Sequence, residues 1–423
     1  LTKDQTKMKI KDEHKNRFMN LSLRMVSLAS KLILTLYMGR YFELSALGAY
    51  GLVFSAVVVV NTLLGQELGY IVKREIVGSS PQAALIKMRD QFIWHSGNYL
   101  IFTLVTTVLL LSGFDYVSPK YIIYILAIGI AESLGSMAYN NMNLLGQQVM
   151  ANGALFIRAA AWVPFVIALG FWDKSFRTED TVLTAWAISS TLSLSVPLWT
   201  WRNWGWKNMI QAKIDYKWMK QSVKKSAPIW LGSLGLMVGG YIDRFFINHF
   251  INIELVGVMT FYYSFINAMP PLIESGALIF SAPKMVEFYK NKKTENFWKE
   301  AKNALIQIGI GVALLSLALS IFVPVLGYFM GKPAFLENIH TFWLLLGATW
   351  INSISLVLHY VLFAQHRDKP IWTGNILFVI PVITGNMFFV PHFGFIGIGY
   401  SAIISALLLI LWRGWFIRSH KGF

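Results

Sequence analysis

Residues 32–56, LILTLYMGRYFELSALGAYGLVFSA, align without gaps with residues 241–265, YIDRFFINHFINIELVGVMTFYYSF, and this alignment decides the predicted fold. It pairs Gly48 with Gly257 and Ser55 with Ser264, an offset of 209 residues. In both copies a long segment ends, a short loop of the form polar, apolar, Gly follows, and an aromatic-rich segment returns. Parallel repeats of this kind predict two bundles related by an axis along the membrane normal, with a substrate site between them.

The composition is that of a membrane protein. Of the 423 residues, 55% are hydrophobic and 14% are charged, whereas a soluble domain carries about 25% charged residues. A helix needs about 20 apolar residues to cross roughly 30 Å of hydrocarbon. The sequence predicts twelve such segments, which start near Arg17, Ala46, Phe92, Tyr121, Asn152, Thr181, Pro228, Glu254, Ala304, Thr341, Ile371 and Gly394.

The predicted fold class is therefore an all-α membrane protein, with twelve transmembrane helices in two six-helix bundles around a central cavity. The long connection of residues 202–227 divides the chain. We expect an N-terminal six-helix lobe of residues 1–215 and a C-terminal six-helix lobe of residues 216–423. The opening residues are polar, and the first apolar run is long and interrupted by charge, so no signal peptide is expected.

The distribution of the cations predicts the orientation in the membrane. A net charge of +16 is also found in nucleic-acid-binding proteins, but most of the 37 Lys and Arg residues fall in the termini and in alternate loops. By the positive-inside rule, both termini are cytoplasmic. The clusters at Lys224 and from Lys290 onward are then topology signals and contacts with membrane lipids, so no nucleic-acid partner is expected. The tryptophan-rich run 199–206 is expected to anchor at the interface.

The sequence predicts no enzyme site, metal or cofactor. The chain has no cysteine, which excludes disulfides, thiol catalysis and thiolate metal sites. The eight histidines show no HExxH or similar ligand spacing. The predicted outer loops are short, the longest being about ten residues around WDKSFRTED at 172–180. No loop is long enough to form an extracytoplasmic catalytic domain.

Polar residues line one face of the first predicted span. Asn20, Arg24, Ser27, Lys31 and Thr35 recur at intervals of 4, 3, 4 and 4, which places them on one side of a helix. A charge at the centre of a bilayer helix costs about 2.5–3.5 kcal/mol, so this face must meet a wet cavity or other polar groups. Similar polar faces occur in the fourth span, with Glu132, and in the eighth, with Glu274.

The seventh predicted span carries two adjacent charges, Asp243 and Arg244. The repeat offset aligns Arg244 with Thr35, so we expect Arg244 to continue the polar face of the first span. Neighbours along a helix do not face each other. Asp243 is therefore expected either to pair with a cation on another helix or to orient Arg244 from the side.

These charges and their polar neighbours form the candidate site. Substrate binding is assigned to Arg24, Lys31, Arg158, Arg244, Asn20 and Ser27. Coupling or ion pairing is assigned to Glu132, Asp243 and Glu274. The alternative is that these groups form interhelical ion pairs with no substrate role. Prolines inside the spans, such as Pro270 and Pro271 just before Glu274, are expected to kink helices, either as hinges or as static bends.

Three stretches resemble the O-antigen flippases, within the polysaccharide flippases of the multidrug/oligosaccharidyl-lipid/polysaccharide exporter superfamily. They are GRYFELSALGAYGLVFSAV at 39–57, DRFFINHFINIELVGVMTFYYSF at 243–265 and FGFIGIGYSAIISALLLILWR at 393–413. The resemblance implies alternating access between two six-helix lobes in a bacterial cell inner membrane. The implied substrate is an undecaprenyl-diphosphate-linked oligosaccharide, moved from the cytoplasmic to the periplasmic leaflet. Polysaccharide polymerase machinery is an implied partner.

A diphosphate headgroup needs fixed positive charge as it leaves water, and an arginine fork suits phosphate. The membrane potential, about 2.3 kcal/mol per charge and 100 mV, and proton transfer through Glu132 or Glu274 are both open as driving forces. One rival function is a multidrug and toxin extrusion type antiporter, for which an acidic cavity is expected. Another is a membrane glycosyltransferase or polymerase, for which a large periplasmic loop is expected.

Overall fold

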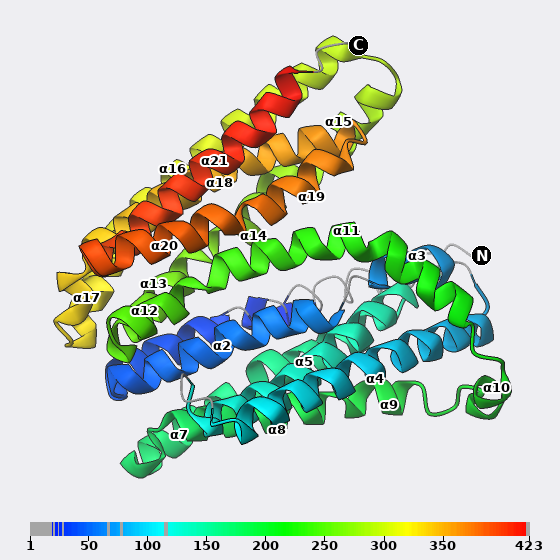
Figure 1. Cartoon of the computed structure of the whole chain (residues 1–423), viewed down its shortest axis with the longest axis horizontal. Helices are drawn as coiled ribbons and strands as arrows, with labels where there is room; N and C mark the ends of the chain where they lie inside the picture. The colour runs from blue at the N-terminus through cyan, green and yellow to red at the C-terminus, as the bar shows by residue number, and fades with distance from the viewer. Residues whose placement is uncertain are drawn as a thin grey trace, which may run out of the picture. The chain divides into compact units, whose positions relative to one another are not determined.

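The structure is a computed structural model that describes residues 19, 22–23, 25–27, 29–65, 68–76, 79–113 and 117–419. The described residues 29–41 are helical, and no strand occurs in the described part of the chain. The α-helices that follow (Figure 1) are α2 (Leu44–Gly65), α3 (Leu68–Ile76), α4 (Pro81–Leu111), α5 (Pro119–Leu144), α6 (Gln148–Phe156), α7 (Val163–Trp172), α8 (Glu179–Ser193), α9 (Ser195–Thr200), α10 (Trp206–Gln211), α11 (Tyr216–Tyr241), α12 (Asp243–Phe250), α13 (Ile253–Ile266), α14 (Met269–Ile273), α15 (Ile279–Lys290), α16 (Thr294–Met330), α17 (Ala334–Glu337), α18 (Ile339–Ala364), α19 (Asp368–Leu377), α20 (Val379–Phe393) and α21 (Ile396–Arg418).

Ten helical segments of the described chain are long and apolar enough to cross a membrane. They are Leu44–Gly65, Gln82–Leu111, Pro119–Leu144, Gln148–Trp172, Glu179–Thr200, Ile253–Lys290, Thr294–Met330, Ile339–Ala364, Asp368–Phe393 and Ile396–Arg418. The chain is a multi-pass membrane protein, and ten of the twelve predicted spans coincide with helices that are long and apolar enough to cross a membrane. The first predicted span falls partly outside the described residues. The seventh corresponds to α11 and α12, where α11 begins with a lysine-rich stretch.

Local sequence signals explain why the helices end where they do. The Asn252 side chain accepts a hydrogen bond from the Leu255 amide at 2.9 Å, which caps the start of α13. Thr178 caps α8 in the same way. Gly331 and Gly394 end α16 and α20 with φ of 70° and 66°, a region that favours glycine. The connections at these points are therefore tight turns.

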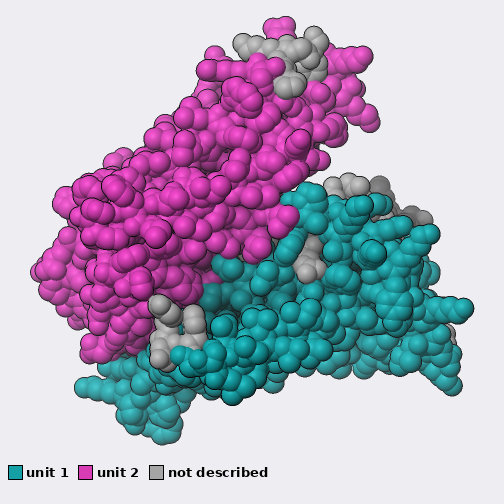
Figure 2. Space-filling model, viewed as in Figure 1, with its two compact units in different colours: residues 1–34, 56–230 teal, residues 35–55, 231–423 magenta. Residues whose placement is uncertain are grey.

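The chain forms two compact units (Figure 2). Unit 1 comprises residues 1–34 and 56–230, and unit 2 comprises residues 35–55 and 231–423. In unit 2, α21 packs along α18 and α20 (Figure 1). In unit 1, α5 packs against α4, α6 and α8. The predicted lobes, 1–215 and 216–423, divide the chain along the repeat and stay a prediction, whereas contacts group residues 35–55 with the second half.

Inside unit 2, α2 and α13 cross at two glycines that the repeat alignment pairs. A Cβ on Gly48 would lie 2.0 Å from the Ile253 carbonyl oxygen, and a Cβ on Gly257 would lie 2.3 Å from the Leu44 carbonyl oxygen. The offset of 209 residues converts Leu44 into Ile253 and Gly48 into Gly257, so each contact is the copy of the other. Only glycine allows the two backbones to approach so closely. This reciprocity supports the predicted repeat.

Candidate functional site

Glu132 on α5 is the centre of a polar cluster in unit 1. Its Oε2 atom lies 3.3 Å from the Arg158 Nε atom. Its Oε1 atom accepts hydrogen bonds from Trp186 Nε1 at 2.9 Å and Ser190 Oγ at 2.8 Å, both on α8. The carboxylate is thus held by one cation and two neutral donors, which orient it between α5, α8 and the segment that carries Arg158.

Arg158 lies in a π-helical turn, Ile157–Ala161, between α6 and α7. Its Nη1 atom donates to the Glu132 carbonyl at 3.0 Å and to Ser136 Oγ at 3.1 Å. The guanidinium passes over Gly135, where a Cβ would lie 2.6 Å from Nη1. The absence of a side chain at Gly135 therefore makes room for the Arg158 side chain against α5.

Lys31 belongs to the same cluster electrostatically. Its side chain is exposed, and the charges of Glu132 and Arg158 both act on its ammonium group. Ser27 is buried, and its hydroxyl donates to the Leu23 carbonyl at 2.7 Å. The predicted site residues Asn20 and Arg24 lie outside the described residues. The described cluster thus has two cations, Lys31 and Arg158, for one carboxylate.

The second charged group, Asp243 and Arg244, lies in unit 2 where α11 ends and α12 begins. Asp243 Oδ1 accepts from the Arg244 amide at 2.8 Å and lies 3.2 Å from Arg244 Nη1. The Arg244 side chain is 2% exposed, and its guanidinium carbon lies 4.4 Å from the Tyr263 ring centroid and 5.1 Å from that of Tyr241. Tyr263 also hydrogen-bonds to Asp243. Of the two predicted arrangements, the structure has the one in which Asp243 orients Arg244.

Glu274 is the first residue of a second π-helical turn, Glu274–Leu278, which follows the two prolines of α14. Its side chain is exposed. In the described part of the chain, no cation lies within ion-pair distance of the Glu274 carboxylate, and the Tyr360 hydroxyl is the group on which its charge acts. In the described part of unit 2, Glu274 therefore has no ion pair with Arg244, which is paired with Asp243.

A buried cation that the sequence interpretation missed is Arg413 on α21. It is 4% exposed, and its Nη1 atom donates to the Ser355 carbonyl and hydroxyl at 3.0 and 2.9 Å. Its Nη2 atom donates to Asn375 Oδ1 at 2.8 Å. The available signal was that Ser401, Ser405 and Arg413 interrupt the apolar sequence of α21, and all three are buried. Its place near the end of the last helix concealed it among the terminal cations.

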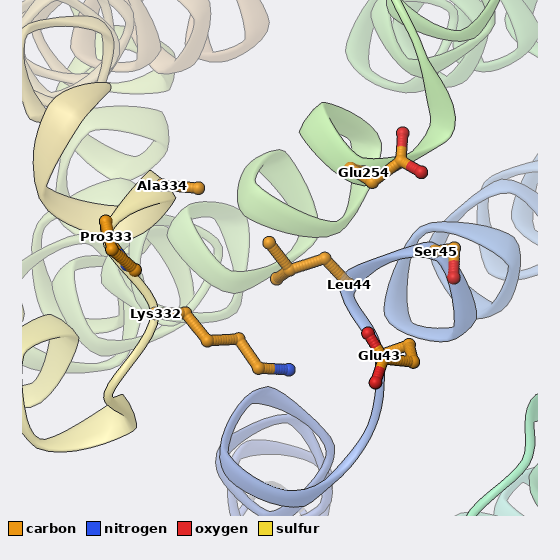
Figure 3. A pocket seen from close by; sticks show the side chains of 7 residues that line it. All are labelled: Glu43, Leu44, Ser45, Glu254, Lys332, Pro333 and Ala334. Carbon is orange, nitrogen blue, oxygen red and sulfur yellow. The ribbon is translucent and has the colours of Figure 1, made fainter.

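A cavity of about 310 Å³ opens in unit 2 at the turn between residue 41 and α2 (Figure 3). Its lining residues are Glu43, Leu44, Ser45, Glu254, Lys332, Pro333 and Ala334. The Lys332 ammonium donates to the Phe42 carbonyl, and the Arg40 guanidinium donates to the Phe329 carbonyl at 2.8 Å. Burial lowers the pKa of Lys332, and the charge of Glu43 opposes that effect. None of the predicted site residues lines this cavity.

The fold is shared with solved transporters. No protein-family model and no curated protein matches the chain. A structure described as the inward-facing conformation of a multidrug resistance MATE family transporter of the MOP superfamily has a TM-score of 0.74 at 13% identity, covering 96% of this chain and 99% of the other. The inward closed conformation of the lipid II flippase MurJ has a TM-score of 0.70 at 13% identity, covering 95% and 87%. A MOP superfamily transporter from Pyrococcus furiosus has a TM-score of 0.57 at 13% identity, covering 96% of this chain and 95% of the other.

At these identities the likeness shows the fold alone. These structures include a multidrug transporter and a lipid II flippase. The likeness in fold does not choose between these two functions for this chain, and only the polar groups in its own helices bear on that choice. The chain has the all-helical fold of the MOP superfamily transporters.

Proposed function

We propose that the chain is a transporter of the MOP type that flips an undecaprenyl-diphosphate-linked oligosaccharide from the cytoplasmic to the periplasmic leaflet of a bacterial inner membrane. One observation carries the proposal. The polar cluster of unit 1 places two cations, Lys31 and Arg158, beside a single carboxylate, Glu132. Glu132 and Arg158 lie in helices that are long and apolar enough to cross a membrane. An excess of positive charge at that depth is unfavourable in the free protein and is offset when an anionic headgroup binds.

The two cations have different parts in this proposal. The Arg158 guanidinium pairs with Glu132 and donates to Ser136. It is therefore held in place, and its charge sets the positive electrostatic potential of the cluster. The Lys31 side chain is exposed, and we assign it the direct contact with the diphosphate, because an ammonium group binds phosphate as a compact point charge.

The resemblance of residues 39–57, 243–265 and 393–413 to O-antigen flippases supports an oligosaccharide as the cargo. The likeness in fold to the lipid II flippase MurJ supports a lipid-linked substrate. A polysaccharide polymerase that uses the flipped unit is the proposed partner. Alternating access, with both termini cytoplasmic, is part of the same proposal.

A second candidate is a multidrug and toxin extrusion type antiporter. The exposed Glu274 carboxylate favours it, since a carboxylate without an ion-pair partner in the described chain can hold an organic cation or a proton. The likeness in fold to a multidrug MATE transporter supports it as well. Uptake of a cationic dye by proteoliposomes, abolished by Glu274→Gln and unaffected by Lys31→Gln, would select this function over the flippase.

The flippase proposal is tested with proteoliposomes that contain a fluorescent undecaprenyl-diphosphate-linked oligosaccharide. The transbilayer rate is read by adding a membrane-impermeant quencher. We expect Lys31→Gln to reduce the rate about 10- to 100-fold, the range for losing one charge-assisted hydrogen bond. Lys31→Arg should keep most of the rate, because it keeps the charge.

Lys290→Gln is the matched control, because Lys290 is exposed at the end of α15, outside the cluster. It should leave the flipping rate unchanged. If Lys31→Gln flips the substrate as fast as the unmodified protein while inserting normally, the assignment of the cluster to the headgroup is wrong. If the unmodified protein itself does not flip the substrate, the flippase function is wrong.

A further inference from the structure

The connection between α8 and α11 carries an unusual amount of positive charge. We call residues 199–225 the linker arm; it includes α10 and the start of α11, and it belongs to unit 1. It contains one acidic residue, Asp215. Its basic residues, all with exposed side chains, are Arg202, Lys207, Lys213, Lys217, Lys220, Lys224 and Lys225.

The linker arm is fixed to α4 by one buried arginine. Arg89 Nη1 donates to the carbonyls of Met209 and Ala212 at 2.5 and 2.6 Å, and Nη2 donates to the Lys213 carbonyl at 3.0 Å. Arg89 is in turn paired with the fully buried Asp90 at 2.6 Å. Three backbone carbonyls, one in α10 and two just after it, are therefore held by a single guanidinium.

Two further contacts complete this attachment. Asp90 Oδ2 accepts from the Asp215 amide at 3.3 Å, and Asp215 Oδ2 lies 3.4 Å from the Lys87 ammonium. Asp215 Oδ1 accepts from the Trp218 amide at 2.9 Å, which starts α11. The one acidic residue of the linker arm is thus used internally, and the cations of the arm are left facing outward.

Exposed apolar side chains lie between these cations. Ile210 is 72% exposed, Tyr216 is 67% exposed and Trp199 is 57% exposed. The Arg202 guanidinium carbon lies 4.3 Å from the Trp199 ring centroid. Amphipathic aromatic groups alternating with lysines are typical of segments that rest at the boundary between headgroups and acyl chains.

We propose that the linker arm is a preformed docking surface for the anionic phospholipid headgroups of the membrane. The charge of the arm complements a negative lipid surface, to which each nearby Lys or Arg adds attraction. The exposed Ile210, Tyr216 and Trp199 reach the interfacial region, and Arg89 keeps the arm in one conformation before lipid binds. This inference is independent of the transported substrate, because it concerns the bulk lipid and not the polar cluster of unit 1.

The test measures thermal unfolding of the full chain in a neutral detergent, with added short-chain phosphatidylglycerol or phosphatidylcholine. Phosphatidylglycerol is expected to raise the unfolding temperature in a concentration-dependent way, and phosphatidylcholine is not. The variant K207Q/K213Q/K217Q/K220Q removes four exposed charges and should shift the half-maximal phosphatidylglycerol concentration upward by about 10-fold or more.

The matched control is K290Q/K293Q/K299Q/K302Q, which removes four exposed charges from unit 2, where Glu287, Glu295 and Glu300 lie among the lysines. These acidic residues lower the net positive charge of the stretch and weaken its predicted lipid contacts, so the variant should retain most of the phosphatidylglycerol response. Equal loss in both variants would show a general effect of net charge and would overturn the proposal. A response of the same size to inorganic phosphate, or to an acidic peptide in place of lipid, would overturn it as well.

Arg89→Gln provides a second measurement, because it leaves every exposed lysine in place. If the variant folds, releasing the three carbonyls should weaken the phosphatidylglycerol response several-fold. An unchanged response in Arg89→Gln would show that the attachment to α4 does not preorganise the surface. If Arg89→Gln does not fold, the two lysine variants still decide the proposal.

Discussion

At the scale of single residues, Glu132 shows how an acidic side chain can be retained among membrane-spanning helices. Arg158, Trp186 and Ser190 all direct donors at its two oxygens. Removing one partner of such a pair leaves an uncompensated charge, whereas removing both leaves polar groups that are easier to accommodate. The interaction energy of Glu132 and Arg158 is therefore a coupling free energy, which is measured by comparing the stabilities of the single and double variants.

We predict that Glu132→Gln lowers the free energy of unfolding by about 3 kcal/mol, because it leaves the Arg158 charge without its carboxylate. The double variant Glu132→Gln/Arg158→Gln should be markedly more stable than the sum of the two single changes implies. Denaturant unfolding in detergent, arranged as a double-mutant cycle, measures this coupling. Additive effects would show that the 3.3 Å contact between Nε and Oε2 contributes no interaction energy.

Asp243 and Arg244 show what a sequence does and does not reveal about a charge pair. The unusual pair of charges was evident from the sequence, because it interrupts an apolar stretch. Its geometry was left open, since neighbours on a regular helix point apart. The Asp243 carboxylate turns toward the next residue, where it accepts from the Arg244 amide and lies 3.2 Å from Arg244 Nη1. The Arg244 guanidinium also lies against the ring of Tyr263 on α13, a contact that the sequence of α11 and α12 alone does not show.

At the scale of secondary-structure elements, the crossing of α2 and α13 depends on a glycine on each helix. We predict that Gly48→Ala destabilises the protein by about 1–3 kcal/mol, the usual penalty for overpacking, because the new Cβ would lie 2.0 Å from the Ile253 carbonyl oxygen. The unfolding temperature in detergent checks this prediction.

Gly97→Ala in α4 is the control for this change, since no atom lies within 4 Å of a Cβ built there. It should be neutral or stabilising by up to about 1 kcal/mol, because alanine is the better helix former. Equal destabilisation by both changes would mean that backbone flexibility, and not the close approach of α2 and α13, makes glycine necessary at residue 48.

The elements also show which parts of the fold could be predicted from sequence. Ten of the predicted spans coincide with long apolar helices, because the length of an apolar run in the sequence is enough to identify such a helix. The π-helical turns at Ile157–Ala161 and Glu274–Leu278 were not predicted, because a π-turn depends on its neighbours, such as Ser189 donating to the Ile157 carbonyl at 2.6 Å. Arg413 was missed for a related reason, since its partners Ser355 and Asn375 are distant in sequence.

At the scale of the whole molecule, α2 connects the two compact units. Its residues 44–55 group with unit 2, and its residues 56–65 group with unit 1. The sequence repeat placed α2 in the first half of the chain, and it did not show that the start of α2 packs on α13. In that packing, Gly48, Gly51 and Gly257 lie so close to the other helix that a Cβ on any of them would clash with its backbone or side-chain atoms.

The absence of cysteine from the chain allows this connection to be tested with a single disulfide. A Cβ built on Gly51 lies 3.1 Å from the Thr260 Cβ, near the separation of about 3.5–4.5 Å found in disulfides. We predict that Gly51→Cys/Thr260→Cys cross-links under mild oxidation and fixes the start of α2 to α13. Under the proposed alternating access, flipping of the lipid-linked oligosaccharide should then fall at least 10-fold and return when a reductant is added. Thr260→Cys alone should transport normally in both conditions. The reduced double variant is the reference for Gly51→Cys, because the single change would place a Cβ 1.9 Å from the Thr260 Oγ1 atom. Full activity of the cross-linked protein would show that α2 and α13 stay together throughout transport, so that the movement between states occurs elsewhere in the chain.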